Sequence, residues 1–97
     1  MREVTLQYLD GCPNWAIADQ RLRTLRSELG FTISYRRVET PEEAERVGFR
    51  GSPTVLIDGE DAFPTDDAAT GLACRVYATP DGSRGSPTSE QLRAVLT

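Results

Sequence analysis

Apolar and polar residues alternate in three short stretches of the chain, which is the period of a β-strand, and a fourth stretch is apolar on both faces. The first stretch covers residues 2–9 and the second covers residues 31–38. Residues 54–57 are apolar on both faces, as expected of a central strand that helices cover on both sides. Residues 72–78 alternate again. The sequence therefore predicts four strands.

Apolar residues at helical spacing predict three helices between and after these strands. The first begins at Pro13, which suits the first position of a helix, and ends at Gly30. Residues 40–43, Thr-Pro-Glu-Glu, have the pattern of a helix start, and Gly48 ends this short helix. Residues 88–91 repeat the capping pattern and begin a terminal helix.

The order of these elements, β-α-β-α-β-β-α, predicts an α/β fold. A right-handed crossover makes the first two strands parallel, and a hairpin at Asp58-Gly59 makes the last two antiparallel. We expect a four-stranded mixed sheet of order 2-1-3-4 that three helices flank. Residues 60–71 fit neither period, and most of them are interpreted as a loop; residues 80–87 hold two glycines and two prolines and are interpreted as a second loop. The length of 97 residues suits one domain, spanning residues 1–97.

Composition narrows the possible functions. The net charge of −4 and the lack of a basic cluster argue against nucleic acid as a partner. The sequence has no apolar run long enough to span a bilayer and no secretory signal, so we expect a soluble cytoplasmic protein, a monomer or weak homodimer. The chain contains no His, which excludes Ser-His-Asp, Cys-His and His-zinc mechanisms within one chain. We predict no bound cofactor.

The two cysteines are the remaining candidates for chemistry, because in a reducing compartment a cysteine is more often free, catalytic or metal-binding than locked in a structural disulfide. Cys12 lies between the first strand and Pro13, at or beside the N-cap of the first helix. Unpaired amides and the positive end of the helix dipole favour a thiolate there. Without that effect, Cys12 is a small turn residue with an ordinary thiol.

Cys74 lies on the predicted fourth strand and has two interpretations. It could approach Cys12 and form a disulfide with it, which requires Cα atoms within about 7 Å. It could instead be a buried and inert strand residue. The neighbouring Arg75 could bind an anion, but a solvated strand residue is the favoured interpretation.

Two motifs resemble the thioredoxin superfamily. Residues 12–15, Cys-Pro-Asn-Trp, look like the CxxC active-site turn with Trp15 in place of the second cysteine. Residues 51–54, Gly-Ser-Pro-Thr, are similar to the segment that holds a cis-proline before the third strand. The resemblance implies that Pro53 is cis and lies against the Cys12 sulfur. It also implies that Ser52 offers its backbone groups to an extended peptide or thiol ligand; otherwise Ser52 is a turn residue.

Trp15 removes the resolving cysteine that would close a disulfide within the turn. Its side chain either contacts substrate or packs as a hydrophobic lid over the helix. More narrowly, these motifs together with Ala-Cys-Arg-Val-Tyr at residues 73–77 resemble small bacterial thioredoxin-like proteins that are often labelled alkylmercury lyase-like. That resemblance implies Cys12 and Cys74 as functional thiols, with Asp10 or Asp58 as a possible acid.

Three hypotheses follow. In the first, the Cys12 thiolate attacks a disulfide, a glutathione adduct or an oxidised small molecule, and Cys74 or an external thiol resolves the mixed disulfide. In the second, Cys12 and Cys74 bind a soft metal ion such as Hg(II) or Cu(I), with or without lyase chemistry. In the third, the domain is redox-inactive and binds a partner through the face that carries Cys12 and Pro53.

Overall fold

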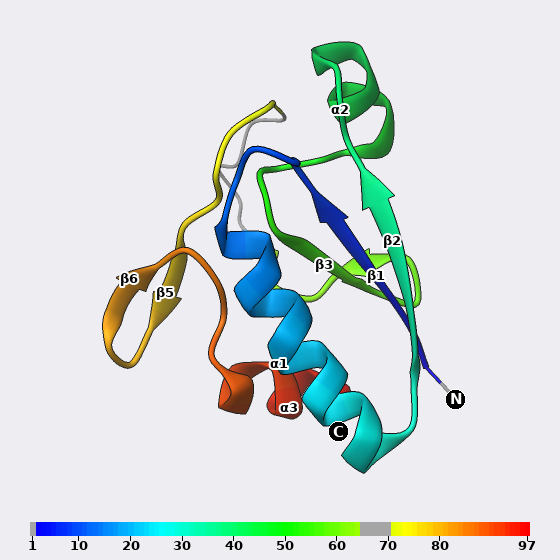
Figure 1. Ribbon diagram of the computed structural model, residues 1–97, viewed down its shortest axis with the longest axis vertical. Coiled ribbons are helices and arrows are strands. Elements are labelled where there is room, and N and C mark those ends of the chain that lie inside the picture. Colours follow the sequence, from blue (N-terminus) through cyan, green and yellow to red (C-terminus); the bar gives the residue numbers. More distant parts are fainter. Residues whose placement is uncertain (1, 65–70) are drawn as a thin grey trace.

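The computed structural model describes residues 2–64 and 71–97, and its centre is a four-stranded mixed sheet (Figure 1). Strand β1 (Glu3–Tyr8) is parallel to β2 (Thr32–Arg37) and antiparallel to β3 (Thr54–Ile57). Strand β4 (Glu60–Asp61) is antiparallel to β3. The order β2-β1-β3-β4 confirms the predicted α/β fold and its strand order.

The fourth strand of this sheet is not the one that the sequence pattern predicted. The chain turns at Asp58 and Gly59, which adopt φ angles of 52° and 88°, and it returns at once along β3. Residues 60–61 therefore take the edge position that was assigned to residues 72–78, and the interpretation of 60–71 as loop is wrong for β4. Residues 65–70 of that predicted loop lie outside the described residues.

Residues 72–78 are largely irregular. Cys74 forms an isolated bridge with Ser52, and strand β5 (Tyr77–Thr79) pairs with β6 (Gly82–Arg84) in a separate two-stranded sheet. The predicted loop at 80–87 thus contains a strand. The alternation at 72–78 is real, because Arg75 and Tyr77 are buried while Val76 is exposed, but only its last two residues belong to a strand.

The three predicted helices are present as α1 (Asn14–Leu29), α2 (Pro41–Val47) and α3 (Ser89–Leu96). Local signals account for their ends. The Thr40 and Thr88 side chains accept hydrogen bonds from the backbone N–H groups of the third helical residues, so they act as N-caps. Gly30 and Gly48 end α1 and α2 in the left-handed conformation.

Helices α1 and α3 cover one face of the sheet, and their apolar side chains form the main core with β1 and β3 (Figure 1). The buried members of this core are Val4, Leu6, Ala18, Leu22, Leu25, Phe31, Val55, Leu92 and Leu96. A smaller cluster, with Val38, Ala44 and Phe49 at its centre, packs α2 against the chain that follows β2. Within residues 2–64 and 71–97, none of the helices is both long and apolar enough to cross a membrane.

Candidate functional site: two cysteines beside a cis-proline

The topology of the sheet brings the two sequence motifs together. Because β1 and β3 are antiparallel, the end of β1 lies beside the beginning of β3, and Gln7 is paired with Thr54. The residues that follow β1 therefore meet those that precede β3. Cys12 is in the first segment, where its N–H donates to the Leu9 carbonyl over 3.1 Å, and Ser52 is in the second.

Cys12 lies close to the beginning of α1, as predicted. The helix starts at Asn14 with Pro13 as its N-cap, so Cys12 directly precedes the cap. Among the hydrogen bonds of the described residues, however, no backbone N–H donates to the Cys12 sulfur. The structure therefore places the sulfur near the helix terminus without showing the amide contacts that the sequence argument invoked.

Residues 73–75, the segment that carries Cys74, pair with Ser52 next to Cys12. The Ser52 N–H donates to the Ala73 carbonyl and the Arg75 N–H donates to the Ser52 carbonyl, each over 2.8 Å. These two bonds hold Cys74 opposite Ser52, and the Sγ atoms of Cys74 and Cys12 are 2.6 Å apart. Figure 1 shows this segment in yellow beside the blue chain that leads into α1.

The Ser52–Pro53 peptide bond is cis, as the resemblance implied. The preceding Gly51 has a φ of 118°, a value that side chains rarely allow. A Cβ atom built on Gly51 would lie 2.9 Å from the Cβ of Arg75. Gly51 therefore permits the close approach of the segment that carries Cys74.

The two sulfurs differ in exposure. Cys12 is only 2% exposed, whereas Cys74 is exposed. The Cys74 thiol donates to the Cys12 sulfur, and the Cys12 thiol in turn donates to the Ser52 carbonyl over 3.7 Å. The interpretation of Cys74 as a buried and inert strand residue does not hold, because Cys74 is exposed and contacts the Cys12 sulfur. Cys12, which was expected to meet the substrate first, is buried beneath Cys74.

The contact between the sulfurs also affects the acidity of Cys74. Its pKa is raised above the ordinary thiol value, chiefly because the thiol donates its proton to Cys12, and further by partial burial and by charge on the Cys12 sulfur. The structure therefore favours the protonated form of Cys74 when both cysteines are reduced.

An open cleft of about 460 Å³ leads to the two sulfurs. Its lining residues include the apolar Leu9, Val38 and Leu72 and the charged Arg37 and Glu39. Both cysteines are among the lining residues. A small molecule in this cleft would thus be in contact with the sulfur pair.

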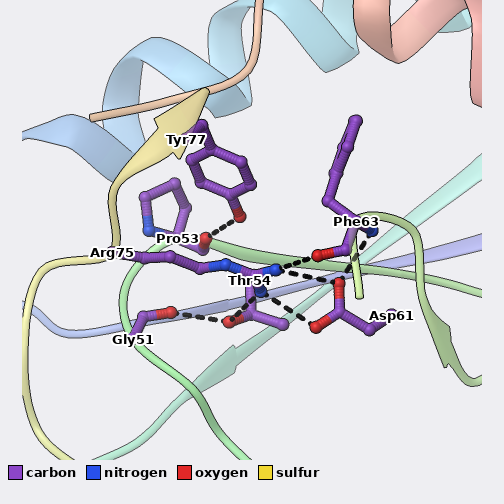
Figure 2. Close-up of polar contacts among 7 residues, drawn as sticks. All are labelled: Gly51, Pro53, Thr54, Asp61, Phe63, Arg75 and Tyr77. Atoms are coloured by element: carbon purple, nitrogen blue, oxygen red, sulfur yellow. Dashed lines mark hydrogen bonds and ion pairs between the residues drawn. The ribbon is translucent and has the colours of Figure 1, made fainter. Parts of the chain in front are cut away.

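Arg75 is not the solvated strand residue that the sequence favoured, because its side chain is only 5% exposed. Figure 2 shows its guanidinium between the carboxylate of Asp61 and the backbone of Phe63. Arg75 Nη1 lies 2.9 Å from Asp61 Oδ2, and a second bond joins Arg75 Nη2 to Asp61 Oδ1 over 3.3 Å. Thr54 Oγ1 accepts a further bond over 3.3 Å.

Tyr77 completes this network from the other side (Figure 2). Its ring lies 4.8 Å from the guanidinium carbon of Arg75, within cation–π range, and its hydroxyl donates to the carbonyl of the cis residue Pro53. Burial raises the pKa of Tyr77, so the phenol stays protonated and remains a donor. The residues on the C-terminal side of Cys74 are therefore anchored to both β4 and the cis-proline segment.

Trp15 and the Ser52 side chain have structural contacts. The Trp15 ring stacks on Tyr8 with centroids 4.3 Å apart and packs against the main core, and it is not among the residues that line the cleft. This contact favours the lid interpretation over substrate binding. The Ser52 hydroxyl accepts a bond from the Leu9 N–H over 3.0 Å, which ties the two motifs together.

The two aspartates considered as acids are far from equivalent. Asp10 lines the cleft beside the cysteines. Asp58 lies at the opposite end of β1, where its carboxylate accepts from the Glu3 N–H and its own N–H donates to the Glu3 carbonyl. The structure thus brings Asp10, but not Asp58, to the sulfur pair. The described residues contain no group of three or more potential metal ligands.

No protein-family model matches this sequence. The site is therefore defined by its own geometry: two sulfurs in contact, a cis-proline segment beneath them and an open cleft beside them. Sequence reasoning missed Asp61, named Gly51 and Tyr77 only as members of motifs, and favoured a solvated position for Arg75. The close approach at Gly51 and the burial of the Arg75 guanidinium become visible only when the folded chain places residues 51 and 75 side by side.

Proposed function

We propose that this protein is a thiol–disulfide oxidoreductase whose redox pair is Cys12 and Cys74. The carrying observation is the 2.6 Å between the two sulfurs, which come from residues 62 positions apart. A disulfide bond is about 2.05 Å long, so a small movement converts the contact into a bond. The chain has no other cysteine to compete for either sulfur.

The proposed reaction is an exchange of two electrons. In the reduced protein each sulfur carries or shares a proton, and an external disulfide R–S–S–R is the oxidant. One protein sulfur attacks it and releases one R–SH, and the second protein sulfur then displaces the other R–SH. The products are the Cys12–Cys74 disulfide and two thiols, and the reverse sequence reduces the protein.

The cleft supports a small molecule as the substrate. The backbone N–H and C=O groups of Ser52 are both used within the chain, by Ala73 and Arg75, so they are not open to an added strand. The cleft, by contrast, is open and borders both sulfurs. We expect the exchanging disulfide or thiol to enter there.

The same sulfur distance weighs against soft-metal binding as the primary function. Two thiolates that bind one metal ion in a linear arrangement, with bonds of roughly 2.3 Å each, hold their sulfurs about 4.6 Å apart. The observed 2.6 Å is far closer to the length of a direct bond. Metal binding would require the segment that carries Cys74 to move away from Ser52.

The test is to equilibrate the purified protein with buffers of defined ratios of reduced to oxidised dithiothreitol and to map the cysteines by mass spectrometry. We expect the oxidised protein to be lighter by two hydrogen atoms than the reduced protein and to contain a single Cys12–Cys74 crosslink. In stopped-flow measurements, hydroxyethyl disulfide should oxidise the reduced protein faster than it oxidises free dithiothreitol at the same thiol concentration.

Cys12→Ser and Cys74→Ser provide matched controls, because serine keeps nearly the same shape and removes the sulfur. Neither variant should form the intramolecular crosslink or release two equivalents of thiol from one equivalent of disulfide. Two free thiols in the wild-type protein after mild oxidation, or exchange no faster than that of the free dithiol, would reject the proposed function.

A further inference from the structure

The position of Cys12 in the turn predicts that its sulfur is accessible, but Cys12 is buried and Cys74 is the exposed cysteine. A sulfur that exchanges with an external molecule must be reachable along the line of the breaking bond. Cys12 is 2% exposed and has the Cys74 sulfur directly against it, whereas Cys74 is exposed. Access to Cys12 is therefore controlled by Cys74.

From this geometry, and building on the proposed function, we infer that Cys74 is the sulfur that forms the mixed disulfide with the external molecule. Cys12 is then the resolving sulfur, which acts only inside the protein. Cys74 thus reacts first and Cys12 second, although Cys12 comes first in the sequence.

Each step balances with these roles. In the reduced protein, Cys74 loses its proton to solvent, its sulfur attacks R–S–S–R, the R–S–S–R bond breaks, and one R–S⁻ leaves and takes up a proton. Cys12 then loses its proton to solvent, and its thiolate attacks the Cys74 sulfur of the mixed disulfide. The bond between the Cys74 sulfur and the S–R group breaks, the Cys12–Cys74 bond forms, and the second R–S⁻ leaves and takes up a proton.

The contacts around both sulfurs support this division of roles. Cys74 is fixed on both sides, by the two backbone bonds to Ser52 and by the anchored side chain of Arg75. A mixed disulfide on Cys74 would project its R group into the open cleft that borders both cysteines. Cys12, held between Ser52 and Cys74, is already in contact with the sulfur that it must attack.

The roles can be tested with 2,2′-dithiodipyridine, a small neutral disulfide that releases a coloured thione at each exchange. The wild-type protein should release two equivalents. Cys12→Ser should release one equivalent quickly and stop with the adduct on Cys74. In Cys74→Ser the serine still covers Cys12, so the release should be slower by about tenfold or more, as expected of a buried thiol.

A second measurement uses the unaltered chain. The reduced wild-type protein is treated with less than one equivalent of N-ethylmaleimide, quenched in acid, and digested for peptide mapping. We expect most of the label on Cys74. Faster thione release by Cys74→Ser than by Cys12→Ser, or label mainly on Cys12, would overturn the inferred order. Either result would leave the crosslink itself, and hence the proposed function, intact.

Discussion

At the scale of single residues, Gly51 determines how closely the segment that carries Cys74 can approach the cis-proline. Its φ of 118° and the 2.9 Å that would separate an added Cβ from Arg75 both exclude larger side chains. Its importance therefore depends on a neighbour that is 24 positions away in the sequence.

We predict that Gly51→Ala destabilises the protein by about 2 kcal/mol or more, since the alanine meets both a strained φ and a steric overlap with the Cβ of Arg75. It should also shift the Cys12–Cys74 pair towards the dithiol. Urea denaturation and dithiothreitol equilibration measure the two effects.

Gly11→Ala is the matched control for this substitution. Gly11 also lies close to the site, but no atom would come within 4 Å of its added Cβ. Its free energy of unfolding should change by no more than about 0.5 kcal/mol. Equal losses in the two variants would show that the contact between Gly51 and Arg75 has no special role.

The sequence was most informative where chemistry is local. Cys12, Cys74 and Pro53 were recognised in advance, and the structure brings all three together. Gly51 was noted only as a member of the motif at residues 51–54 and Arg75 was expected to be solvated, because their roles arise from a contact between distant segments. The burial of Cys12 beneath Cys74 was not foreseen for the same reason: only the folded chain shows which cysteine covers the other.

At the scale of elements, the buried ion pair joins β4 to the segment that carries Cys74. Arg75 is 5% exposed and Asp61 is 19% exposed at their side chains, so water screens their interaction only weakly. The connection is unusual in that β4 has only two residues. Its place in the molecule is secured by this side-chain contact as well as by its pairing with β3.

We predict that Asp61→Asn costs roughly 2–4 kcal/mol of unfolding free energy, because it leaves the guanidinium of Arg75 buried without its charge partner. Chemical denaturation of the reduced protein measures this loss. The double variant Asp61→Asn/Arg75→Met should lose less than the sum of the two single losses, since the pair is then removed as a unit.

The exposed pair Arg37 and Glu39 supplies the comparison. Their side chains are 50% and 56% exposed, and Glu39→Gln is expected to change stability by less than about 1 kcal/mol. If Asp61→Asn were as mild as Glu39→Gln, or if the two single losses were simply additive, the ion pair would not act as the anchor described above.

Element prediction succeeded where a start or stop signal was present and failed where it was absent. Thr40 and Thr88 cap their helices as expected, because a cap depends on residues within one turn. Strand β4 has only two residues and therefore no period to detect. The alternation at residues 72–78 is present in the structure, but the face that carries the apolar Leu72 and Val76 is the exposed one and Arg75 is buried. The pattern also could not say that Cys74 pairs with Ser52 outside the main sheet.

At the scale of the whole molecule, a Cys12–Cys74 disulfide would close a large part of the chain into one loop. The two residues are 62 positions apart, and a loop of that length is predicted to reduce the entropy of the unfolded state by an amount worth about 4 kcal/mol at 25 °C. This is a substantial fraction of the stability of a domain of this size.

We therefore predict that the oxidised protein unfolds at a higher urea concentration than the reduced protein, by an amount that corresponds to about 4 kcal/mol. The unfolding midpoints with and without dithiothreitol provide the measurement. Cys12→Ser should have the same midpoint in both conditions. A midpoint for the oxidised protein that is equal to or below that of the reduced protein would contradict the prediction.

The use of the Ser52 backbone by the chain itself has one more consequence. An extended polypeptide that sought the same N–H and C=O groups would have to compete with residues 73–75 for two hydrogen bonds. Displacing those residues would also move Cys74 away from Cys12 and expose the Cys12 sulfur. In the oxidised protein the Cys12–Cys74 disulfide would hold residues 73–75 in place covalently, so the polypeptide could not displace them. Such a polypeptide could therefore bind the reduced protein but not the oxidised protein.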